Sequence, residues 1–256
     1  ITTANNNVHP PGYEGRPVFY HSSRGIETSR IARLHDIFGS GKPLSVMEHM
    51  QIQHDAYVLA GERDVPLFRG WTSEDPDLEW ARGLVADWDA TLSRESTAAA
   101  IYVRWNAEVD DRAQDSDEVM TAVERQTLVE EGLAAALERL GGELGADRST
   151  WRHGRVHESQ LPHMMSSAFD LPSVERPGGF GSVNATGANF RRIIDLADLD
   201  RSVASNSPGQ SAQPGSPYYG NLVDNLGNGE YFPLLYTRGA IEERADHRLV
   251  LEPEDD

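Results

Sequence analysis

The strongest constraint on the fold is a change in hydrophobic pattern near Gly141-Gly142. Before this point, apolar residues recur at helical spacing. After Trp151, short extended runs are separated by Gly, Pro, Asn and Ser, as in strands joined by ordered loops. We therefore expect a strand end and loop over residues 1–23, a helical region over 24–145 and a strand- and loop-rich region over 146–256. Together they predict an α+β fold.

Start and stop signals divide the two halves further. Ser45 and Glu48 form a capping box that predicts the start of a helix. The helices are expected over 24–38, 45–62, 75–90, 95–107 and 116–140, and the extended runs over 191–196, 202–205, 231–236 and 248–251. The Gly- and Pro-rich stretch 205–216 lies between extended runs and is interpreted as a structured loop. The acidic tail 252–256 is expected to fray.

Charge limits the classes of partner. The chain has 41 Asp and Glu against 23 Lys and Arg, which gives a formal charge of -18. Such a surface repels nucleic acid, so we expect no nucleic-acid partner. No apolar run approaches the roughly 18 residues of a membrane-spanning helix, so no membrane span is expected. The chain has no cysteine, which excludes disulfides, thiolate catalysis and cysteine metal ligands.

The acidic, lysine-poor composition predicts adaptation to a salty environment, since Lys42 is the only lysine. A high-GC genome that favours Arg over Lys explains the scarcity of lysine but not the excess of acid. In molar salt the Debye length falls to roughly 3 Å and repulsion among carboxylates is screened. We therefore expect the melting temperature of the complete protein to rise from dilute to molar KCl. A melting temperature that stays flat or falls contradicts this interpretation.

Short motifs taken singly favour structural roles. His153 and His157 are four residues apart, with His163 beyond, and this spacing on a helix could ligate a metal. Gly154 argues against a helix there, so structural histidines are the preferred interpretation. The run Gly178-Gly179-Phe180-Gly181 predicts a turn, and Asn184-Ala185-Thr186 matches a glycosylation sequon, a short pattern that often occurs by chance.

The motifs taken together, in their order along the chain, indicate more. They are Thr3-Ala4-Asn5-Asn6, Arg24 with Arg30-Ile31, Met50-Gln51-Ile52-Gln53-His54-Asp55, Leu84 with Trp88-Asp89, Trp151-Arg152-His153-Gly154-Arg155-Val156-His157, Phe190-Arg191-Arg192, Asp195-Leu196, Gly209-Gln210-Ser211, Ser216-Pro217-Tyr218-Tyr219 and Asn228-Gly229-Glu230-Tyr231. From about Thr3 to Pro253 this series resembles the C-terminal part of the β chain of the penicillin acylase family. That family of N-terminal-nucleophile hydrolases includes penicillin, cephalosporin and acyl-homoserine-lactone acylases.

The resemblance implies a fold and a reaction. The fold is an αββα sandwich, to which this chain supplies peripheral helices and C-terminal strands. Family members are precursors that cleave themselves, so that a serine becomes the first residue of the β chain and its α-amino group acts as the base. This chain begins with Ile1, so we expect the nucleophile on a segment absent here, and no activity from this chain alone.

The resemblance also assigns residues. Taken alone, the run Asn5-Asn6-Asn7 predicts a turn. Under the resemblance, Asn5 matches the side-chain amide that stabilises the tetrahedral oxyanion, with Asn6 as its alternative. Arg24 matches an arginine that assists maturation and substrate positioning, although an arginine capping a helix start is an equal alternative. Glu14 is the carboxylate closest in sequence to the position of a calcium ligand in the family. The resemblance therefore allows a structural calcium, whereas the chemistry needs no cofactor.

Other matched residues have architectural roles. Trp88 and Trp151 are expected in the core, and Asp55 and Asp89 are expected to bind backbone or arginine partners. Ala212 and Tyr218 depart from the family pattern, where Gly and His are usual.

The predicted function is thus hydrolysis of a small-molecule linear amide to a carboxylic acid and an amine. We expect the chain to take part in this reaction together with the remaining segments of the same precursor. The resemblance implies an extracellular or cell-envelope location. One alternative is an inactive binding or assembly subunit of the same fold. Another is a metal hydrolase that uses His153, His157 and His163.

Overall fold

The computed structural model describes residues 2–4, 29–114, 122–179, 181–185, 187 and 190–251, and the side chains of 110–114 and 122–126 are outside this description. The chain forms two compact units. Unit 1 comprises Ile1–Pro43 and Gln51–Ala188, and unit 2 comprises Leu44–Met50 and Asn189–Asp256. Unit 1 also contains the first hairpin after the helices. Helices and two small antiparallel sheets give the α+β class predicted from the sequence.

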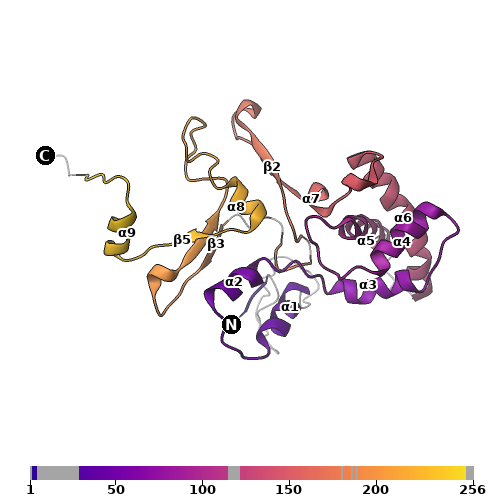
Figure 1. Ribbon diagram of the computed structural model, residues 1–256. Coiled ribbons are helices and arrows are strands. Elements are labelled where there is room, and N and C mark those ends of the chain that lie inside the picture. Colours follow the sequence, from indigo (N-terminus) through magenta and orange to yellow (C-terminus); the bar gives the residue numbers. More distant parts are fainter. Residues whose placement is uncertain are drawn as a thin grey trace, which may run out of the picture. The chain divides into compact units, whose positions relative to one another are not determined.

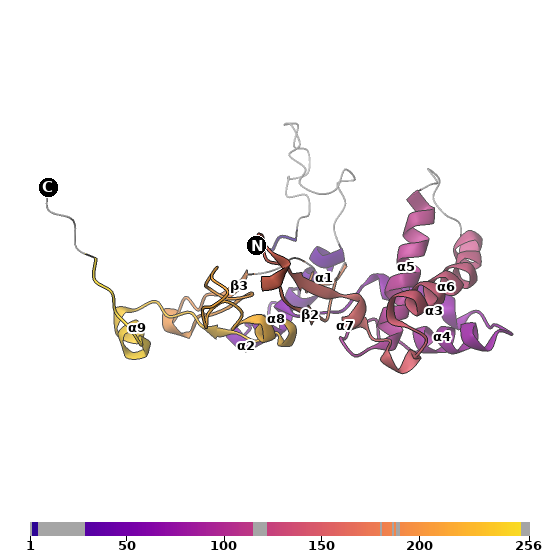
Figure 2. The same cartoon turned by 90° about the horizontal axis from the view of Figure 1, so that it is seen from above.

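Unit 1 is a helical layer followed by a β-hairpin (Figure 1). Its elements are α1 (Ser29–Phe38), α3 (Ala60–Arg69), α4 (Pro76–Ala86), α5 (Thr97–Gln114), α6 (Ala122–Leu144), η1 (Arg148–Thr150), α7 (His153–Val156), β1 (Glu158–Leu161), η2 (Ser167–Phe169) and β2 (Leu171–Glu175). The helix α2 (Val46–Gln53) begins in the segment that clusters with unit 2. Helices α5 and α6 lie side by side in both Figure 1 and Figure 2.

Local sequence sets where these helices start. The predicted capping box before α2 is confirmed, because Glu48 N–H donates to Ser45 Oγ at 3.2 Å and Ser45 N–H donates to Glu48 Oε2 at 2.8 Å. At α4, Asp75 accepts from Asp77 N–H at 2.8 Å and Pro76 follows at the first helical position.

The prediction of one helix over 45–62 is wrong, since α2 ends at Gln53 and α3 begins at Ala60. Residues 56–58 instead pair with residues 90–92. Val58 N–H donates to Ala90 O and Leu92 N–H donates to Ala56 O, both at 2.9 Å. These long-range backbone bonds replace the helical bonds that the local pattern favoured. Gly61 allows the close approach, because a Cβ there would lie 2.5 Å from the Cβ of Ala90.

The hydrophobic core of the described chain lies among the helices of unit 1. Trp105 of α5 is fully buried and meets Phe68 edge-on at 4.9 Å between ring centroids and Tyr102 at 5.8 Å. Gly132 of α6 lies against the indole, where a Cβ would be 3.1 Å from Trp105 Cδ1. Trp88 and Trp151 are also buried, as predicted.

Unit 2 is a three-stranded antiparallel sheet with short helices. Its elements are β3 (Phe190–Ile193), η3 (Leu199–Arg201), β4 (Val203–Asn206), α8 (Val223–Asn228), β5 (Phe232–Pro233) and α9 (Arg238–Arg244). The strand order is β3-β4-β5, with Arg192 opposite Ala204 and Ala204 opposite Phe232. Ala204 and Leu226 are buried where α8 packs on the central strand.

Beyond β4, the loop and the C-terminal segment differ in how well the sequence predicted them. The stretch 205–216 is an ordered loop as predicted, because Gln210 N–H and Ser211 N–H both donate to Tyr218 O, at 3.0 and 3.1 Å. The predicted strand over 248–251 is wrong, since this segment is irregular and exposed. A strand needs a neighbour for its backbone groups, and the described residues provide none there. The tail 252–256 lies outside the described residues.

Candidate functional site

The predicted catalytic residues Asn5 and Arg24 lie outside the described residues, as do Asn6 and the candidate calcium ligand Glu14. The described chain resumes at Ser29, the first residue of α1. The assignments of these residues therefore stay predictions. Among the described residues, the histidine segment and the glycine loop contact each other directly.

The histidine segment forms one helical turn, α7, so the argument that Gly154 excludes a helix is wrong. Tertiary hydrogen bonds impose the turn: His153 N–H donates to Ser96 O at 3.0 Å, and Gly154 N–H donates to Arg94 O at 2.8 Å. Glycine is required at 154 because a Cβ would lie 2.6 Å from Arg94 Cγ and 2.7 Å from Glu175 Oε2. Side chains closing on Gly154 thus fix the position of His153.

The glycine loop supplies the partner of His153. Gly178 and Gly179 have φ values of 79° and 138°, and Gly181 has 91°, so the predicted turn is confirmed. Gly178 N–H donates to Leu92 O at 2.9 Å, and its carbonyl oxygen accepts from His153 Nε2 at 2.6 Å. Because a carbonyl oxygen only accepts, Nε2 carries the proton. Its Nδ1 is buried and has no hydrogen-bond partner in the described part of the chain.

His157 stacks on His153, with ring centroids 5.4 Å apart and planes at 27°. Its Nδ1 faces the carbonyl oxygen of Arg176 at 3.3 Å. Burial lowers the pKa of His157 and lowers that of His153 to about 4, so both rings are neutral at pH 7. Two neutral rings that each face a backbone carbonyl support a structural role.

The three histidines of the metal hypothesis are not brought together. His163 lies in the loop beyond β1, where its ring meets Phe169 edge-on at 5.4 Å. Among the described residues, no group of three or more His, Asp or Glu side chains is placed to hold a metal ion. The arrangement offers at most the pair His153 and His157, and Nε2 of His153 is already engaged.

The low pKa of His153 predicts a pH dependence of stability. An unfolded histidine binds a proton near pH 6.5, whereas the folded one resists protonation until about pH 4. The free energy of unfolding should therefore fall as the pH drops from about 6.5 to 4, by about 3 kcal/mol from this group. His153→Gln, which keeps an N–H for the Gly178 carbonyl, should remove that part of the dependence. Equilibrium unfolding of the complete protein at several pH values measures it.

The matched control is the same substitution at the exposed His247. An unaltered acid dependence in His153→Gln would show that the folded protein does not hold this ring neutral.

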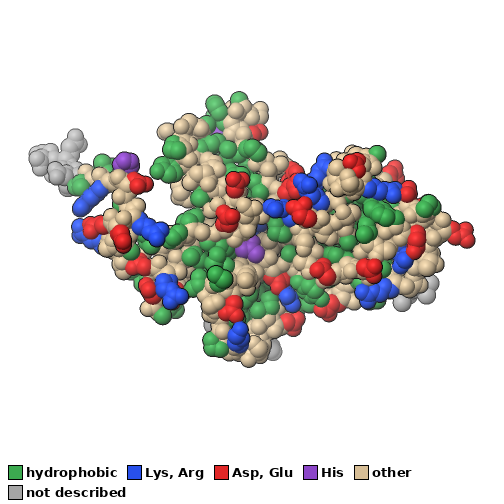
Figure 3. Space-filling view, in the orientation of Figure 1, with side chains coloured by type: hydrophobic (Ala, Val, Ile, Leu, Met, Phe, Trp, Pro, Cys, Tyr) green, Lys and Arg blue, Asp and Glu red, His purple; other side chains and the backbone are tan. Residues whose placement is uncertain are grey.

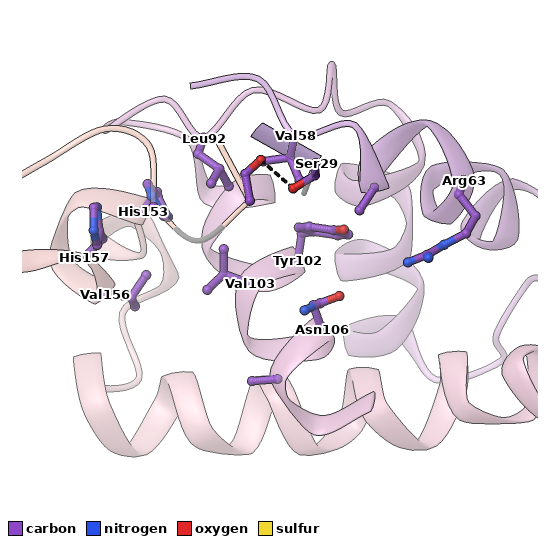
Figure 4. Close-up of a pocket in the computed structure, with 14 residues that line it drawn as sticks. Ser29, Val58, Arg63, Leu92, Tyr102, Val103, Asn106, His153, Val156 and His157 are labelled. Atoms are coloured by element: carbon purple, nitrogen blue, oxygen red, sulfur yellow. Dashed lines mark hydrogen bonds between the residues drawn. The ribbon is translucent and has the colours of Figure 1, made fainter. Parts of the chain in front are cut away.

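Beside the two histidines lies a pocket of about 440 Å³ within unit 1. Figure 4 shows His153, His157 and Val156 at one end and Arg63 at the other, with side chains of α5 between them. The pocket is lined by Ser29, Val58, Ala60, Arg63, Leu92, Tyr102, Val103, Asn106, Ala107, His153, Val156, His157, Gly179 and Gly181. Ser29 Oγ donates to the Gly181 carbonyl at 3.1 Å, so this hydroxyl is not arranged as a nucleophile on a base.

At the polar end of the pocket, Arg63 and Tyr102 bind a buried carboxylate, Asp64, that the sequence did not indicate. Asp64 is fully buried and accepts from Tyr102 Oη at 2.9 Å. It also accepts two bonds from Arg63, from Nε at 2.6 Å and Nη2 at 2.9 Å. Nothing in the local pattern marks Asp64 as buried, because its partner Tyr102 lies 38 residues further along the chain. The pocket therefore has apolar walls and a charged, hydrogen-bonded end, an arrangement suited to binding.

The matched aspartates have the predicted architectural roles. Asp55 Oδ2 pairs with Arg33 Nη2 at 2.7 Å, and its Oδ1 accepts from Tyr57 N–H at 2.9 Å. Asp89 Oδ1 accepts from Thr91 N–H at 2.9 Å. These bonds support the two chain segments, residues 56–58 and 90–92, that pair with each other.

The sequon at Asn184 is not open to glycosylation in this structure. Asn184 is 1 % exposed, and its Nδ2 donates to the carbonyl oxygen of Pro177 at 3.1 Å. Its amide therefore holds the glycine loop, in keeping with a chance match to a short pattern. Thr186 lies outside the described residues.

Comparison with known proteins places this mixed helical and β architecture in a family. The family model of penicillin amidase matches residues 1–243, and the chain belongs to that family. Among solved structures, a thermostable penicillin G acylase from Alcaligenes faecalis has the same fold, with a TM-score of 0.54 and 14 % identity. The likeness covers 98 % of this chain and 57 % of that one.

Curated relatives match part of the chain. Acyl-homoserine lactone acylase QuiP from Pseudomonas putida is 27 % identical over 147 residues, and QuiP from Pseudomonas fluorescens (strain Pf-5) is 28 % identical over 123 residues. These matches cover 51 % and 43 % of this chain, but only 18 % and 15 % of the relatives. No helix of the described residues combines the length and hydropathy needed to cross a membrane.

Proposed function

We propose that this chain is part of an amide hydrolase that transfers the acyl group of a small linear amide to an N-terminal serine and then to water. The observation that carries the proposal is the family match over residues 1–243. The serine is supplied by a segment of the same precursor outside this chain. In support, the chain spans 57 % of the solved penicillin G acylase and the match spans 18 % of the Pseudomonas putida relative.

In the proposed mechanism the α-amino group of the serine takes the hydroxyl proton as the oxygen attacks the amide carbon. The side-chain amide of Asn5 donates to the oxyanion of the tetrahedral intermediate. The leaving amine takes the proton, and water then attacks the acyl-enzyme and releases the carboxylic acid. Arg24 positions the substrate. These steps use only protein groups, so the chemistry needs no cofactor.

The described part of the chain has a supporting role in this proposal. His153, Gly154 and Gly178 form hydrogen bonds that hold neighbouring backbone segments together. The peripheral helices and C-terminal strands would then brace an αββα sandwich completed by the other segments. Rigid supporting elements of this kind fix catalytic groups that lie on neighbouring segments.

The proposal predicts that the complete protein is active and that this chain expressed alone is not. The complete protein should hydrolyse a chromogenic phenylacetyl amide or a long-chain acyl amide, and penicillin G and an acyl-homoserine lactone extend the substrate panel. Intact mass and N-terminal sequencing should show a serine at a newly formed terminus. Saturable turnover by the isolated chain would contradict the assignment of the nucleophile to another segment.

Two other results would change the proposed function. A correctly cleaved protein with an N-terminal serine that hydrolyses none of these amides would favour an inactive binding or assembly subunit. Loss of turnover on chelation, with metal found by elemental analysis at the histidines, would favour a metal hydrolase.

A further inference from the structure

The hairpin of unit 1, residues 158–175, is a two-stranded ribbon in the described structure, and we call it the β1–β2 arm. Glu158 lies opposite Glu175 and Leu161 opposite Leu171, with an irregularity in register between Ser159 and Leu161. In Figure 1 the arm projects from the helices of unit 1. An isolated two-stranded ribbon is marginally stable in water, so such an arm ordinarily packs on something else.

Side-chain and backbone hydrogen bonds hold the base of the arm. Arg152 binds Glu175 through two bonds, Nε to Oε2 at 2.8 Å and Nη2 to Oε1 at 2.6 Å. Arg176 N–H donates to the carbonyl oxygen of His157 at 3.1 Å, which extends the ladder to α7. The arm is therefore attached to the helical core through Glu175 and through the flanking residues His157 and Arg176.

The end of the arm is apolar and exposed. Met164 is 97 % exposed, Met165 is 86 % exposed and Phe169 is 47 % exposed, and we call these three residues the methionine tip. In Figure 3, hydrophobic side chains lie at the upper end of the arm. Residues 161–169 contain no Asp, Glu, Lys or Arg, whereas those residue types make up 25 % of the chain. An uncharged, apolar tip on so acidic a protein is typical of a contact surface.

The tip is also ordered internally. His163 N–H donates to Asp170 Oδ1 at 2.7 Å, and Ser166 Oγ accepts from Ala168 N–H at 3.3 Å. The edge-on contact between His163 and Phe169 closes the loop. A pre-formed loop loses little entropy on binding, and methionine side chains adapt to an irregular apolar partner.

We propose that the methionine tip docks on an apolar surface of a segment of the same protein outside this chain, an inference that rests on the proposed function. The solved penicillin G acylase extends well beyond this chain, which covers 57 % of it, so that protein has further segments on which an arm of this kind can pack. Other occupants fit less well. A formal charge of -18 opposes both a second copy of this chain and an anionic bilayer.

The occupant can be identified by photocrosslinking in the complete protein. p-Benzoylphenylalanine at position 165 should crosslink, and mass spectrometry should find the attached peptide in a segment outside residues 1–256. The exposed position 249 is the control, where the same group should give little crosslinking. A peptide from residues 1–256, from either the same or a second copy, would overturn the proposal. So would the absence of a crosslink at 165.

Substitution and oxidation give a second test that is independent of catalysis. In the complete protein, peroxide should oxidise Met164 and Met165 at least tenfold more slowly than in the protein unfolded in guanidinium. Met164→Gln with Met165→Gln should lower retention of the other segments on purification on the order of tenfold. Met47→Gln, at an exposed methionine of α2, should not. Equal oxidation rates in the folded and unfolded protein would contradict the docking.

The outcomes separate this inference from the proposed function. If the complete protein hydrolyses amides but the methionine tip is not protected from oxidation, the proposed function stands and the docking is wrong. If the tip is protected from oxidation but the complete protein hydrolyses no amide, the docking stands and the proposed function is wrong.

Discussion

Replacing Asn5 by alanine in the complete protein should lower kcat by roughly 10²–10³, the scale for removing one oxyanion-hole donor. KM should change much less, because the amide acts mainly on charge that develops in the transition state. If Asn5 were only a turn residue, the substitution would instead reduce stability and leave kcat intact. Steady-state kinetics together with a thermal melt therefore distinguish the two roles.

Maturation has to be checked first, because the same donor can assist self-cleavage. A gel of the Asn5→Ala protein shows whether the precursor is processed, and only processed protein is assayed. Asn6→Ala and Asn7→Ala are the matched controls in the same run of asparagines, and we expect both to retain kcat. Near-normal kcat in processed Asn5→Ala, with a large loss in Asn6→Ala, would move the assignment to Asn6.

Replacing Trp105 by alanine should destabilise unit 1 by about 3–5 kcal/mol, the range for truncating a large buried aromatic side chain. Trp105 is fully buried between Phe68 and Tyr102, and Gly132 lies against its indole, so the helices cannot easily close the cavity. Hydrogen exchange at the α5 amides, measured in the complete protein, reports the free energy of opening this unit. Trp71→Ala, at a half-buried tryptophan on the edge of the core, should cost less.

The contact with Gly132 allows a sharper test of this packing. Gly132→Ala alone should be destabilising, because its Cβ would lie 3.1 Å from Trp105 Cδ1. In the Trp105→Ala background the steric conflict is gone, and the better helix propensity of alanine should make the same change neutral or stabilising. Additive effects of the two substitutions would show that α5 and α6 do not meet at this point.

Trp105→Phe separates the ring from its N–H group. Trp105 Nε1 is buried without a hydrogen-bond partner among the described residues. Phenylalanine removes that unsatisfied donor and keeps an aromatic ring, so we expect a smaller loss than in the alanine variant.

Several features could be predicted from the sequence because they depend on neighbouring residues. Ser45 and Glu48 cap α2 across three positions, and Asp75 with Pro76 starts α4 in the same way. The glycines of the loop at 178–181 adopt the positive φ angles that their residue type allows. The ordered series of motifs from Thr3 onward indicated the penicillin acylase family, which the match over residues 1–243 confirms.

Other features depend on residues far apart in the chain, and the local pattern could not reveal them. The break between α2 and α3 arises from pairing of residues 56–58 with 90–92, and the helical turn at His153 arises from bonds to Ser96 and Arg94. The burial of Asp64 depends on Tyr102, and the burial of Asn184 depends on the glycine loop that it holds. The sequence by itself determined the α+β class, the helix caps, the glycine turn and the family. Only the tertiary structure decided where helices stop, which polar groups are buried and which apolar residues stay exposed on the β1–β2 arm, because those outcomes depend on long-range hydrogen bonds and packing.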